Sequence, residues 1–177
     1  MKIQLIEEFH LGEFYQHYLR HFAESGMGDE IIFHPSLEFK ETSLEDFKKR
    51  FKANEVKKEG QRKDRVWGLF DEKGKIRGEI SLHFSSMKSA HHRAKMSIGI
   101  EAEYRGKGFA NQLMNVALEW AKNENNLDWI DLYVFAHNAK AISLYEKYGF
   151  KKLALKKDVF RVNGKKIDDM EMTLNLL

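Results

Sequence analysis

The period of the hydrophobic pattern changes twice in the second half of the chain, and this order constrains the fold more than any other feature. Apolar residues alternate with polar ones over residues 94–100, which is typical of a strand with one buried face. They then recur every three or four positions from Phe109 to Trp120, which predicts a helix of about three to four turns. Alternation returns over residues 130–134. The chain therefore needs a sheet with at least one helix packed against it.

Further strands and helices are predicted on both sides of this segment. Ser43 is a good N-cap for a helix that begins at Leu44, and Gly149 suits the C-terminal end of a helix that begins near Asn138. The remaining pattern predicts a helix over residues 11–22 and strands over residues 2–6, 66–70, 76–84, 150–162 and 167–176. We expect one α/β domain of the mixed α+β type, with a mixed, mostly antiparallel central sheet and helices on both of its faces.

The composition fits one folded domain and excludes several classes of site. A chain of 177 residues is long enough for one sizeable core and short for two. It has no cysteine, so a disulfide scaffold, a thiolate metal site and a cysteine nucleophile are excluded. No apolar run approaches the ~20 residues that cross a bilayer, and the first residues lack the apolar core of a signal peptide. We expect a cytoplasmic protein without a membrane partner.

The charges and histidines give little support for a nucleic-acid partner or a metal. The net charge is +3, and acidic and basic residues are mixed along the chain, as on an ordinary solvated surface. A pI near 8.9 and runs such as Lys48-Lys49-Arg50 leave an RNA- or ribosome-binding protein as an alternative. The sequence has no nucleic-acid-binding motif, so we expect no direct contact with nucleic acid. His91 and His92 are adjacent in a predicted loop and lack further ligands, so we expect no metal.

The sharpest local feature is a glycine-rich turn between a strand and a helix, Tyr104-Arg105-Gly106-Lys107-Gly108-Phe109-Ala110. Its glycines let the backbone approach a ligand closely, the first amides of the helix lack partners inside it, and the helix dipole adds positive charge. Arg105 and Lys107 add full charges, so the turn suits a pyrophosphate. A plain turn with solvated basic neighbours is the alternative. The spacing fits neither a P-loop nor a dinucleotide-binding fingerprint. In the fingerprint, the position of the third glycine is occupied here by Asn111.

Two motifs resemble the GNAT superfamily of N-acetyltransferases. Arg105-x-x-Gly108-x-Ala110 resembles its pyrophosphate loop, Arg/Gln-x-x-Gly-x-Gly/Ala. The run from Asn138 to Phe150 resembles its Asn-x-x-Ala-x-x-Leu-Tyr-x-x-x-Gly-Phe motif, and the separation of the two motifs also agrees. The chain is most similar to the branch that contains spermidine acetyltransferases and ribosomal-protein N-terminal acetyltransferases. The resemblance implies acetyl-CoA as the acetyl donor and two central parallel strands that splay apart.

The resemblance also implies which residues bind the donor. It makes residues 1–177 a single domain, with an acetyl-CoA-binding core over residues 66–176 and a poorly matching acceptor side over residues 1–65. It places the pantetheine arm along the backbone of Ile98, Gly99 and Ile100, where the Gly99 amide would stabilise an oxyanion. A plain core strand with a glycine bulge is the alternative. The other implied cofactor-binding residues are Arg105, Gly106, Lys107, Gly108, Phe109, Ala110, Asn111, Asn138, Lys140, Ala141 and Tyr145.

The same resemblance implies the catalytic groups. Tyr145 matches the family's usual general acid, which protonates the departing CoA thiolate, and packing in the core is its alternative role. The incoming amine must lose a proton before it attacks. Glu101 is the first side-chain candidate for that base, ahead of Glu79 and His83, but a relay of ordered water ranks above it.

The acceptor is expected to be a primary amine that attacks the thioester directly. Where spermidine acetyltransferases have His-Arg-x-Ala-Glu, this chain has His92-Arg93-Ala94-Lys95, and residues 85–91 before it contain no acid. We therefore expect a protein or peptide N-terminus or an amino-acid-like amine. A polyamine stays the alternative, because acids of the N-terminal region could fold over the site: Glu38, Glu41, Glu45 and Asp46. A non-catalytic CoA-binding or ribosome-interaction module is the alternative of another class, and formation of a homo-oligomer is left open.

Overall fold

A computed structural model gives the fold and describes residues 1–25, 34, 43–55, 62–162 and 164–177. The helices are α1 (Leu11–Glu24), α2 (Leu44–Glu55), α3 (Phe109–Lys122) and α4 (Ala139–Lys147), with short 3₁₀ helices η1 (Glu8–His10), η2 (Lys88–Ala90) and η3 (Ala102–Tyr104). The strands are β1 (Lys2–Leu5), β2 (Arg65–Phe70), β3 (Ile76–Phe84), β4 (Arg93–Ile100), β5 (Trp129–Phe135), β6 (Lys151–Val162) and β7 (Lys165–Asn175). No helix among the described residues is long and apolar enough to cross a bilayer.

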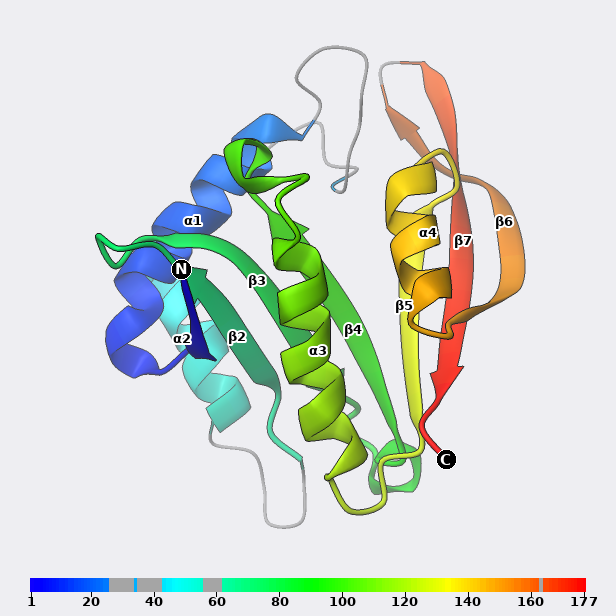
Figure 1. The fold of residues 1–177 in the computed structure, drawn as a ribbon, viewed down its shortest axis with the longest axis horizontal. Helices are drawn as coiled ribbons and strands as arrows, with labels where there is room; N and C mark the ends of the chain where they lie inside the picture. The colour runs from blue at the N-terminus through cyan, green and yellow to red at the C-terminus, as the bar shows by residue number, and fades with distance from the viewer. Residues whose placement is uncertain (26–33, 35–42, 56–61, 163) are drawn as a thin grey trace.

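The strands of the described residues form one sheet in the order β1-β2-β3-β4-β5-β7-β6 (Figure 1). Each neighbouring pair is antiparallel except β4 and β5, which run parallel. Helices α3 and α4 lie on one face of the sheet, and α1 and α2 lie on the other (Figure 1). This is the mixed, mostly antiparallel sheet with flanking helices that the sequence predicts.

The two faces of the sheet bury separate hydrophobic clusters. The larger cluster includes Leu69 of β2, Ile80 of β3 and Leu113 of α3, all fully buried. A smaller cluster joins Leu11 of α1 to Phe70 of β2, with side chains of α2 packed around it. Leu69 and Phe70 enter different clusters because successive side chains of a strand point to opposite faces.

Local sequence signals fix three helix ends. The Ser43 hydroxyl accepts a hydrogen bond from the Asp46 amide at 3.1 Å, which caps α2. The Asn138 side chain accepts one from the Ala141 amide at 3.1 Å, which caps α4. Gly149 ends that helix with φ +91°, a left-handed conformation that favours glycine.

The parallel strands β4 and β5 pair over a short stretch and then separate (Figure 1). Residues 93–95 of β4 pair with residues 129–131 of β5, while β4 continues to Ile100 and β5 to Phe135. On its other edge, β4 stays in register with β3 through Ile100. Among the described residues, the edge of β4 that faces β5 therefore has no strand partner beyond Lys95, which confirms the expected splay.

Candidate functional site

The splay places the beginnings of two helices at the same end of the sheet. Strand β4 leads through η3 into α3, and β5 leads into α4 through a short turn, so both helices begin where the two strands have moved apart (Figure 1). The amide ends of helices carry partial positive charge. The gap between β4 and β5 is thus bordered by two helix N-termini.

The glycine-rich turn before α3 has the geometry of an anion cradle. Gly106 and Gly108 have φ values of +72° and +82°, and a Cβ added to either would meet no atom within 4 Å. The amides of Asn111 and Gln112 bind the Gly108 carbonyl at 3.1 and 3.3 Å, and no side chain of the described residues caps the helix. The first amides of a helix have no partner inside it, so those of Phe109 and the next residue are the ones that an outside ligand would bind. A pyrophosphate fits this open, amide-lined turn.

The two basic residues of the cradle differ in their contacts. The Arg105 guanidinium donates to the Ile100 carbonyl at 2.7 Å and to the carboxylate of Glu24 on α1. Lys107 is exposed, and its ammonium lies 5.3 Å from the centre of the Tyr104 ring. Arg105 therefore links the cradle to α1, and Lys107 is the cation that faces solvent beside the glycines.

Helices α3 and α4 are joined next to the cradle. The side chain of Asn111 accepts a hydrogen bond from Lys147 at 2.8 Å, and the backbone carbonyl of Asn111 accepts one from the Tyr148 hydroxyl at 3.0 Å. In the first turn of α4, Lys140 is exposed and Ala141 packs against the core. Phe109 and Ala110 at the start of α3 also pack against that core. The first turns of α3 and α4 thus pack against the same core, and Asn111 joins the two helices.

Tyr145 lies in the wall between α4 and the sheet. Its side chain is 7% exposed and packs in the main core, with its ring centre 5.9 Å from that of Phe150. No hydrogen bond joins its hydroxyl to another described residue. Burial raises the pKa of Tyr145 to about 12, so the group keeps its proton at neutral pH.

The strand that carries Gly99 is regular, and its other face is covered by α1. Pairing between β3 and β4 passes through Glu79 and Gly99 without a shift in register, so no bulge occurs there. A Cβ on Gly99 would lie 2.2 Å from the His21 ring and 2.7 Å from a Glu79 carboxylate oxygen. Gly99 is thus needed for the close approach of α1, a reason that the sequence does not reveal. Ile98 and Ile100 pack on the α3 side.

Glu101 is held by three cationic side chains. Its carboxylate accepts hydrogen bonds from His17 at 2.8 Å, from Arg20 at 2.8 Å and from Arg77 at 3.0 Å, and the residue is 5% exposed. Burial raises its pKa, but the bonds from His17, Arg20 and Arg77 outweigh burial and lower the pKa to about 2. A carboxylate held in this way is a poor proton acceptor at neutral pH. This geometry does not favour Glu101 as the base.

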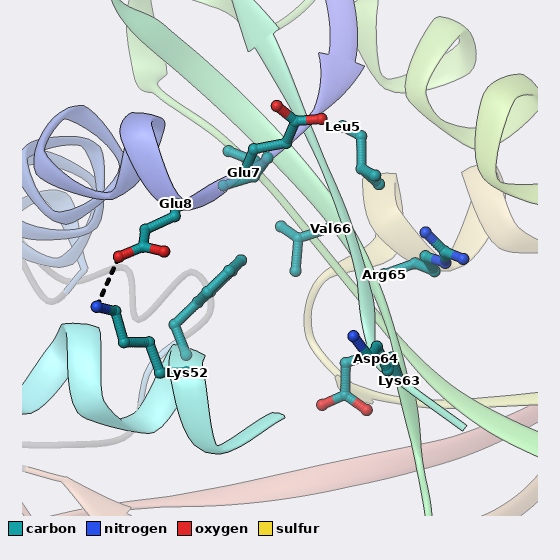
Figure 2. A pocket seen from close by; sticks show the side chains of 10 residues that line it. Leu5, Glu7, Glu8, Lys52, Lys63, Asp64, Arg65 and Val66 are labelled. Atoms are coloured by element: carbon teal, nitrogen blue, oxygen red, sulfur yellow. Dashed lines mark ion pairs between the residues drawn. The ribbon is translucent and has the colours of Figure 1, made fainter. Parts of the chain in front are cut away.

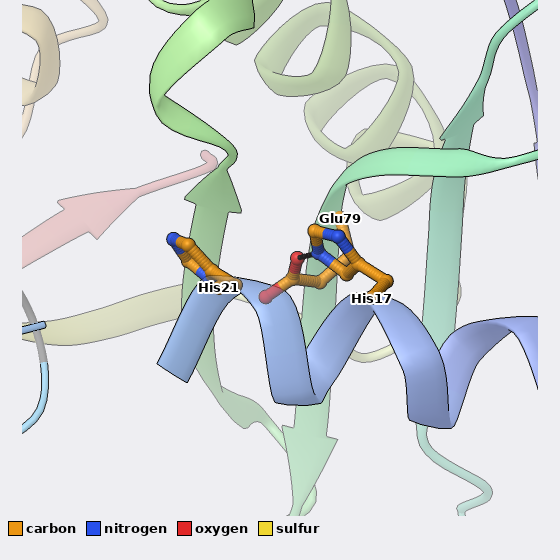
Figure 3. A group of neighbouring side chains, drawn as sticks. All are labelled: His17, His21 and Glu79. Atoms are coloured by element: carbon orange, nitrogen blue, oxygen red, sulfur yellow. Dashed lines mark hydrogen bonds and ion pairs between the residues drawn. The ribbon is translucent and has the colours of Figure 1, made fainter. Parts of the chain in front are cut away.

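Sequence reasoning missed two histidines of α1 that lie beside Glu79. His17 and Glu79 face one another in direct contact, and His21 lies one turn further along α1 (Figure 3). Burial lowers the pKa of His17, but hydrogen bonds to Glu101 and Glu79 outweigh it and raise the pKa to about 9. Burial lowers the pKa of His21 to about 4, so that ring is neutral. The His-x-x-x-His spacing within a predicted helix was the signal that could have found this pair.

A cavity of about 520 Å³ lies elsewhere, between β1, β2 and α2 (Figure 2). Its lining includes Val66, Arg65 and the ion pair between Glu8 and Lys52, whose charged atoms are 2.6 Å apart. It is at the far edge of the sheet from β5, and none of the expected site residues lines it. We therefore do not assign the donor site to this cavity.

The comparisons with known proteins point to one family. The sequence model of the acetyltransferase (GNAT) family matches residues 29–150. That match begins within the segment that we expected to be divergent.

Two curated relatives have different acceptors in their names. An L-amino acid N-acetyltransferase of Escherichia coli is 30% identical over 95 residues, which cover 54% of this chain and 59% of the relative. A spermidine N(1)-acetyltransferase of Vibrio cholerae is 39% identical over 82 residues, 46% of this chain and 47% of the relative. The chain thus spans about half to three-fifths of these relatives' lengths.

A solved structure extends the similarity over the whole fold. The structure of an acetyltransferase of the GNAT family from Streptococcus pneumoniae superposes with a TM-score of 0.81. It covers 98% of both chains at 23% sequence identity. At that identity the likeness shows the fold alone.

Proposed function

We propose that this chain, which belongs to the acetyltransferase (GNAT) family, transfers an acetyl group from acetyl-CoA to a primary amine. The observation that carries the proposal is the cradle formed by Gly106 and Gly108 at the start of α3, beside the splayed edge of β4. Left-handed glycines, open space and helix amides without partners suit the pyrophosphate of the donor. The alternative, a glycine turn that binds no ligand, gives no reason for β4 and β5 to separate beside it.

The residues around the gap would divide the work of binding and transfer. Gly106, Gly108 and the first amides of α3 would bind the pyrophosphate, with Lys107 as a neighbouring cation. The unpaired edge of β4 from Ile98 to Ile100 would bind the pantetheine arm by its backbone. Asn138 would cap α4 and contact the arm at the same time. The donor would thus lie between β4 and β5.

Tyr145 would act as the general acid. Its ring is buried, and its hydroxyl keeps its proton because its pKa is raised to about 12. That proton would pass to the sulfur of the departing CoA as the bond between carbon and sulfur breaks. The low dielectric that raises the pKa of Tyr145 also disfavours a thiolate, which assists the transfer.

A relay of water to bulk solvent is the proposed path for the proton of the amine. Hydrogen bonds from His17, Arg20 and Arg77 stabilise the negative charge of Glu101. Its pKa of about 2 makes proton capture from an ammonium unfavourable. Glu101 would instead position α1 against the sheet. Replacement of Glu101 should therefore lower the stability of the fold more than it slows proton transfer.

For the acceptor we propose an amine with a neutral or acidic body, either a peptide N-terminus or an amino-acid-like amine. Lys95 on β4 is exposed, and its ammonium lies 4.4 Å from the Tyr133 ring centre, while Lys156 lies 4.8 Å from the same centre. Lys156 is paired with Glu171 at 2.9 Å, so Lys95 is the cation that weighs against a polycation beside this ring. The amino-acid acetyltransferase among the relatives supports this class, and the spermidine enzyme supports the polyamine alternative.

The acids that could favour a polyamine are only partly described. Glu38 and Glu41 lie outside the described residues. Glu45 and Asp46 lie on α2, where Lys48 and Lys49 approach their carboxylates to 3.5 and 3.6 Å. These pairs leave α2 with little net negative charge at its first turn.

A steady-state comparison of acceptors tests the proposal. Free amino acids, short peptides with free N-termini and spermidine would be compared at fixed acetyl-CoA by release of CoA thiol. We expect the highest kcat/KM for an amino acid or peptide. A kcat/KM for spermidine above that of every other amine would restore the polyamine reading. Binding of acetyl-CoA with no turnover of any amine would favour a non-catalytic CoA-binding module.

A further inference from the structure

A second cluster of side chains lies between α1 and the sheet, apart from the cradle. His17 and His21 are four residues apart on α1, so both rings project from one side of the helix. The rings are nearly parallel, with centres 5.5 Å apart and an angle of 15° between their planes. Two histidines at this helical spacing can bind one metal ion, as in helical zinc sites.

The facing strand β3 supplies a third side chain of the right kind. Glu79 projects toward α1 between the two histidines (Figure 3). One ligand atom from each of His17, His21 and Glu79 lies within 4.8 Å of the others. Both histidines are buried, at 1% and 7% exposure. Zinc bonds to nitrogen and oxygen are about 2.0–2.2 Å long, so a shared ion would need the touching atoms of His17 and Glu79 to move apart and the His21 ring to approach them.

A second carboxylate orients one of the histidines. Glu101 accepts a hydrogen bond from Nδ1 of His17 at 2.8 Å, while Nε2 of that ring faces Glu79. Arg20 and Arg77 in turn hold Glu101 in place. Metal-binding histidines usually donate their second ring N–H to a carboxylate in this way, which fixes the ring and strengthens it as a ligand.

The sheet leaves room for this cluster at one position. Gly99 of β4 lies directly beneath it, where a side chain would collide with the His21 ring and with a Glu79 oxygen. Three protein ligands in a tetrahedral shell leave one position for water or another small ligand. A metal ion bound by these three side chains would keep such an open position.

We propose that His17, His21 and Glu79 bind one divalent transition-metal ion of the zinc class. Imidazole and carboxylate ligands suit zinc better than magnesium or calcium, which prefer oxygen ligands. His17 and Glu79 touch directly in this structure, and the ion would replace that contact by one bond to each. Our expectation of no metal considered the loop pair His91 and His92, whereas the histidines of this site lie on α1. The proposal does not depend on acetyl transfer.

The test is titration of the chelator-treated full chain with zinc, followed by calorimetry, and with cobalt, followed by its visible absorption. We expect one ion per chain, with a tetrahedral cobalt spectrum. His21→Ala removes one ligand, and Glu79→Gln keeps the shape while removing the charge. Each should weaken zinc binding at least tenfold. His92→Ala, at an exposed histidine outside the cluster, should leave binding unchanged.

Circular dichroism and thermal unfolding of the metal-free variants show whether each is folded. The proposal is overturned if the folded wild-type chain binds no zinc. The contact between His17 and Glu79 would then be a hydrogen bond in which the two side chains share a proton. The proposal is also overturned if Glu79→Gln and His21→Ala bind as tightly as wild type, or if His92→Ala abolishes binding. Acetyltransferase activity plays no part in these outcomes, so failure of the proposed function would be seen separately.

Discussion

Arg93 of β4 binds Asp131 of β5 through two hydrogen bonds, 2.8 and 2.6 Å long, within the short stretch where these strands pair. The Thr173 hydroxyl of β7 donates to the same carboxylate at 2.6 Å. Beyond this point the strands separate, so the pair closes the base of the gap proposed for the donor. The Asp131 side chain is 21% exposed, and the Arg93 side chain is 36% exposed.

The first prediction is that Asp131→Asn destabilises the fold by about 1–2 kcal/mol at pH 7, the range for a partly screened charged hydrogen bond. Burial raises the pKa of Asp131, but Arg93 and Thr173 outweigh it and the net shift is downward. The stabilisation is therefore present above the ordinary value near pH 4 and is lost as pH falls through the lower folded value. Urea unfolding of both proteins from pH 7 to pH 3 should show the difference shrink.

A matched control for that pair is Glu146→Gln. The carboxylate of Glu146 lies 2.9 Å from Lys152, but the two side chains are 48% and 47% exposed, so its loss should change stability little. Equal effects of the two substitutions would contradict a special role for the pair at the base of the gap.

The second prediction concerns the cradle. Gly108→Glu places a carboxylate and a side chain where the pyrophosphate would lie, so the affinity for acetyl-CoA should fall at least tenfold, or about 1.4 kcal/mol. Calorimetry measures it. Gly74→Glu is the control, because Gly74 has φ +74° and equally open space but lies in the turn between β2 and β3. If both variants bind acetyl-CoA like wild type, the cradle assignment is wrong.

The third prediction separates catalysis from packing at two tyrosines near the C-terminal end of α4. Tyr145→Phe removes only a hydroxyl, and kcat should fall about 10²-fold while acetyl-CoA binding changes little. Tyr148→Phe removes a hydroxyl that lies 3.0 Å from the Asn111 backbone carbonyl and 2.8 Å from the Asn115 side-chain oxygen, so it should lower stability by about 1 kcal/mol and spare kcat. An unchanged kcat in Tyr145→Phe would make Tyr145 a packing residue.

The fourth prediction is the effect of pH on that acid. Since burial raises the pKa of Tyr145 from 10 to about 12, the hydroxyl stays protonated as pH rises from 7 to 10. Any decline in the kcat of wild type over this range should therefore also appear in Tyr145→Phe. A fall in wild-type kcat with an apparent pKa near 10, missing in the variant, would mean that Tyr145 titrates like an exposed tyrosine.

The fold could be predicted from the sequence where the signals are local. Strand β3 has the bounds predicted from alternation, and Ser43, Asn138 and Gly149 mark helix ends through bonds or angles that each residue type favours. The splay was expected from the resemblance to a family, since nothing local in residues 96–100 indicates a missing partner strand.

The contacts of the α1 face could not be predicted, because they join residues far apart in the chain. His17 meets Glu79 and Glu101 across 62 and 84 positions, and Arg105 reaches back 81 positions to Glu24. Helical spacing indicates which residues share a side of α1, but it does not indicate which strand that side covers. For the same reason Glu101 was expected as a base, while its burial among three cations is visible only in the fold.

The most direct test of acetyl transfer is a mass measurement of the amine product, made together with release of CoA thiol from acetyl-CoA. In wild type we predict one N-acetylated amine for each thiol released, with no acetylated enzyme intermediate. In Gly108→Glu both should fall together at subsaturating acetyl-CoA, and Gly74→Glu should match wild type. Wild-type protein that binds acetyl-CoA but forms no N-acetylated product from any amino acid, peptide or polyamine would contradict the account.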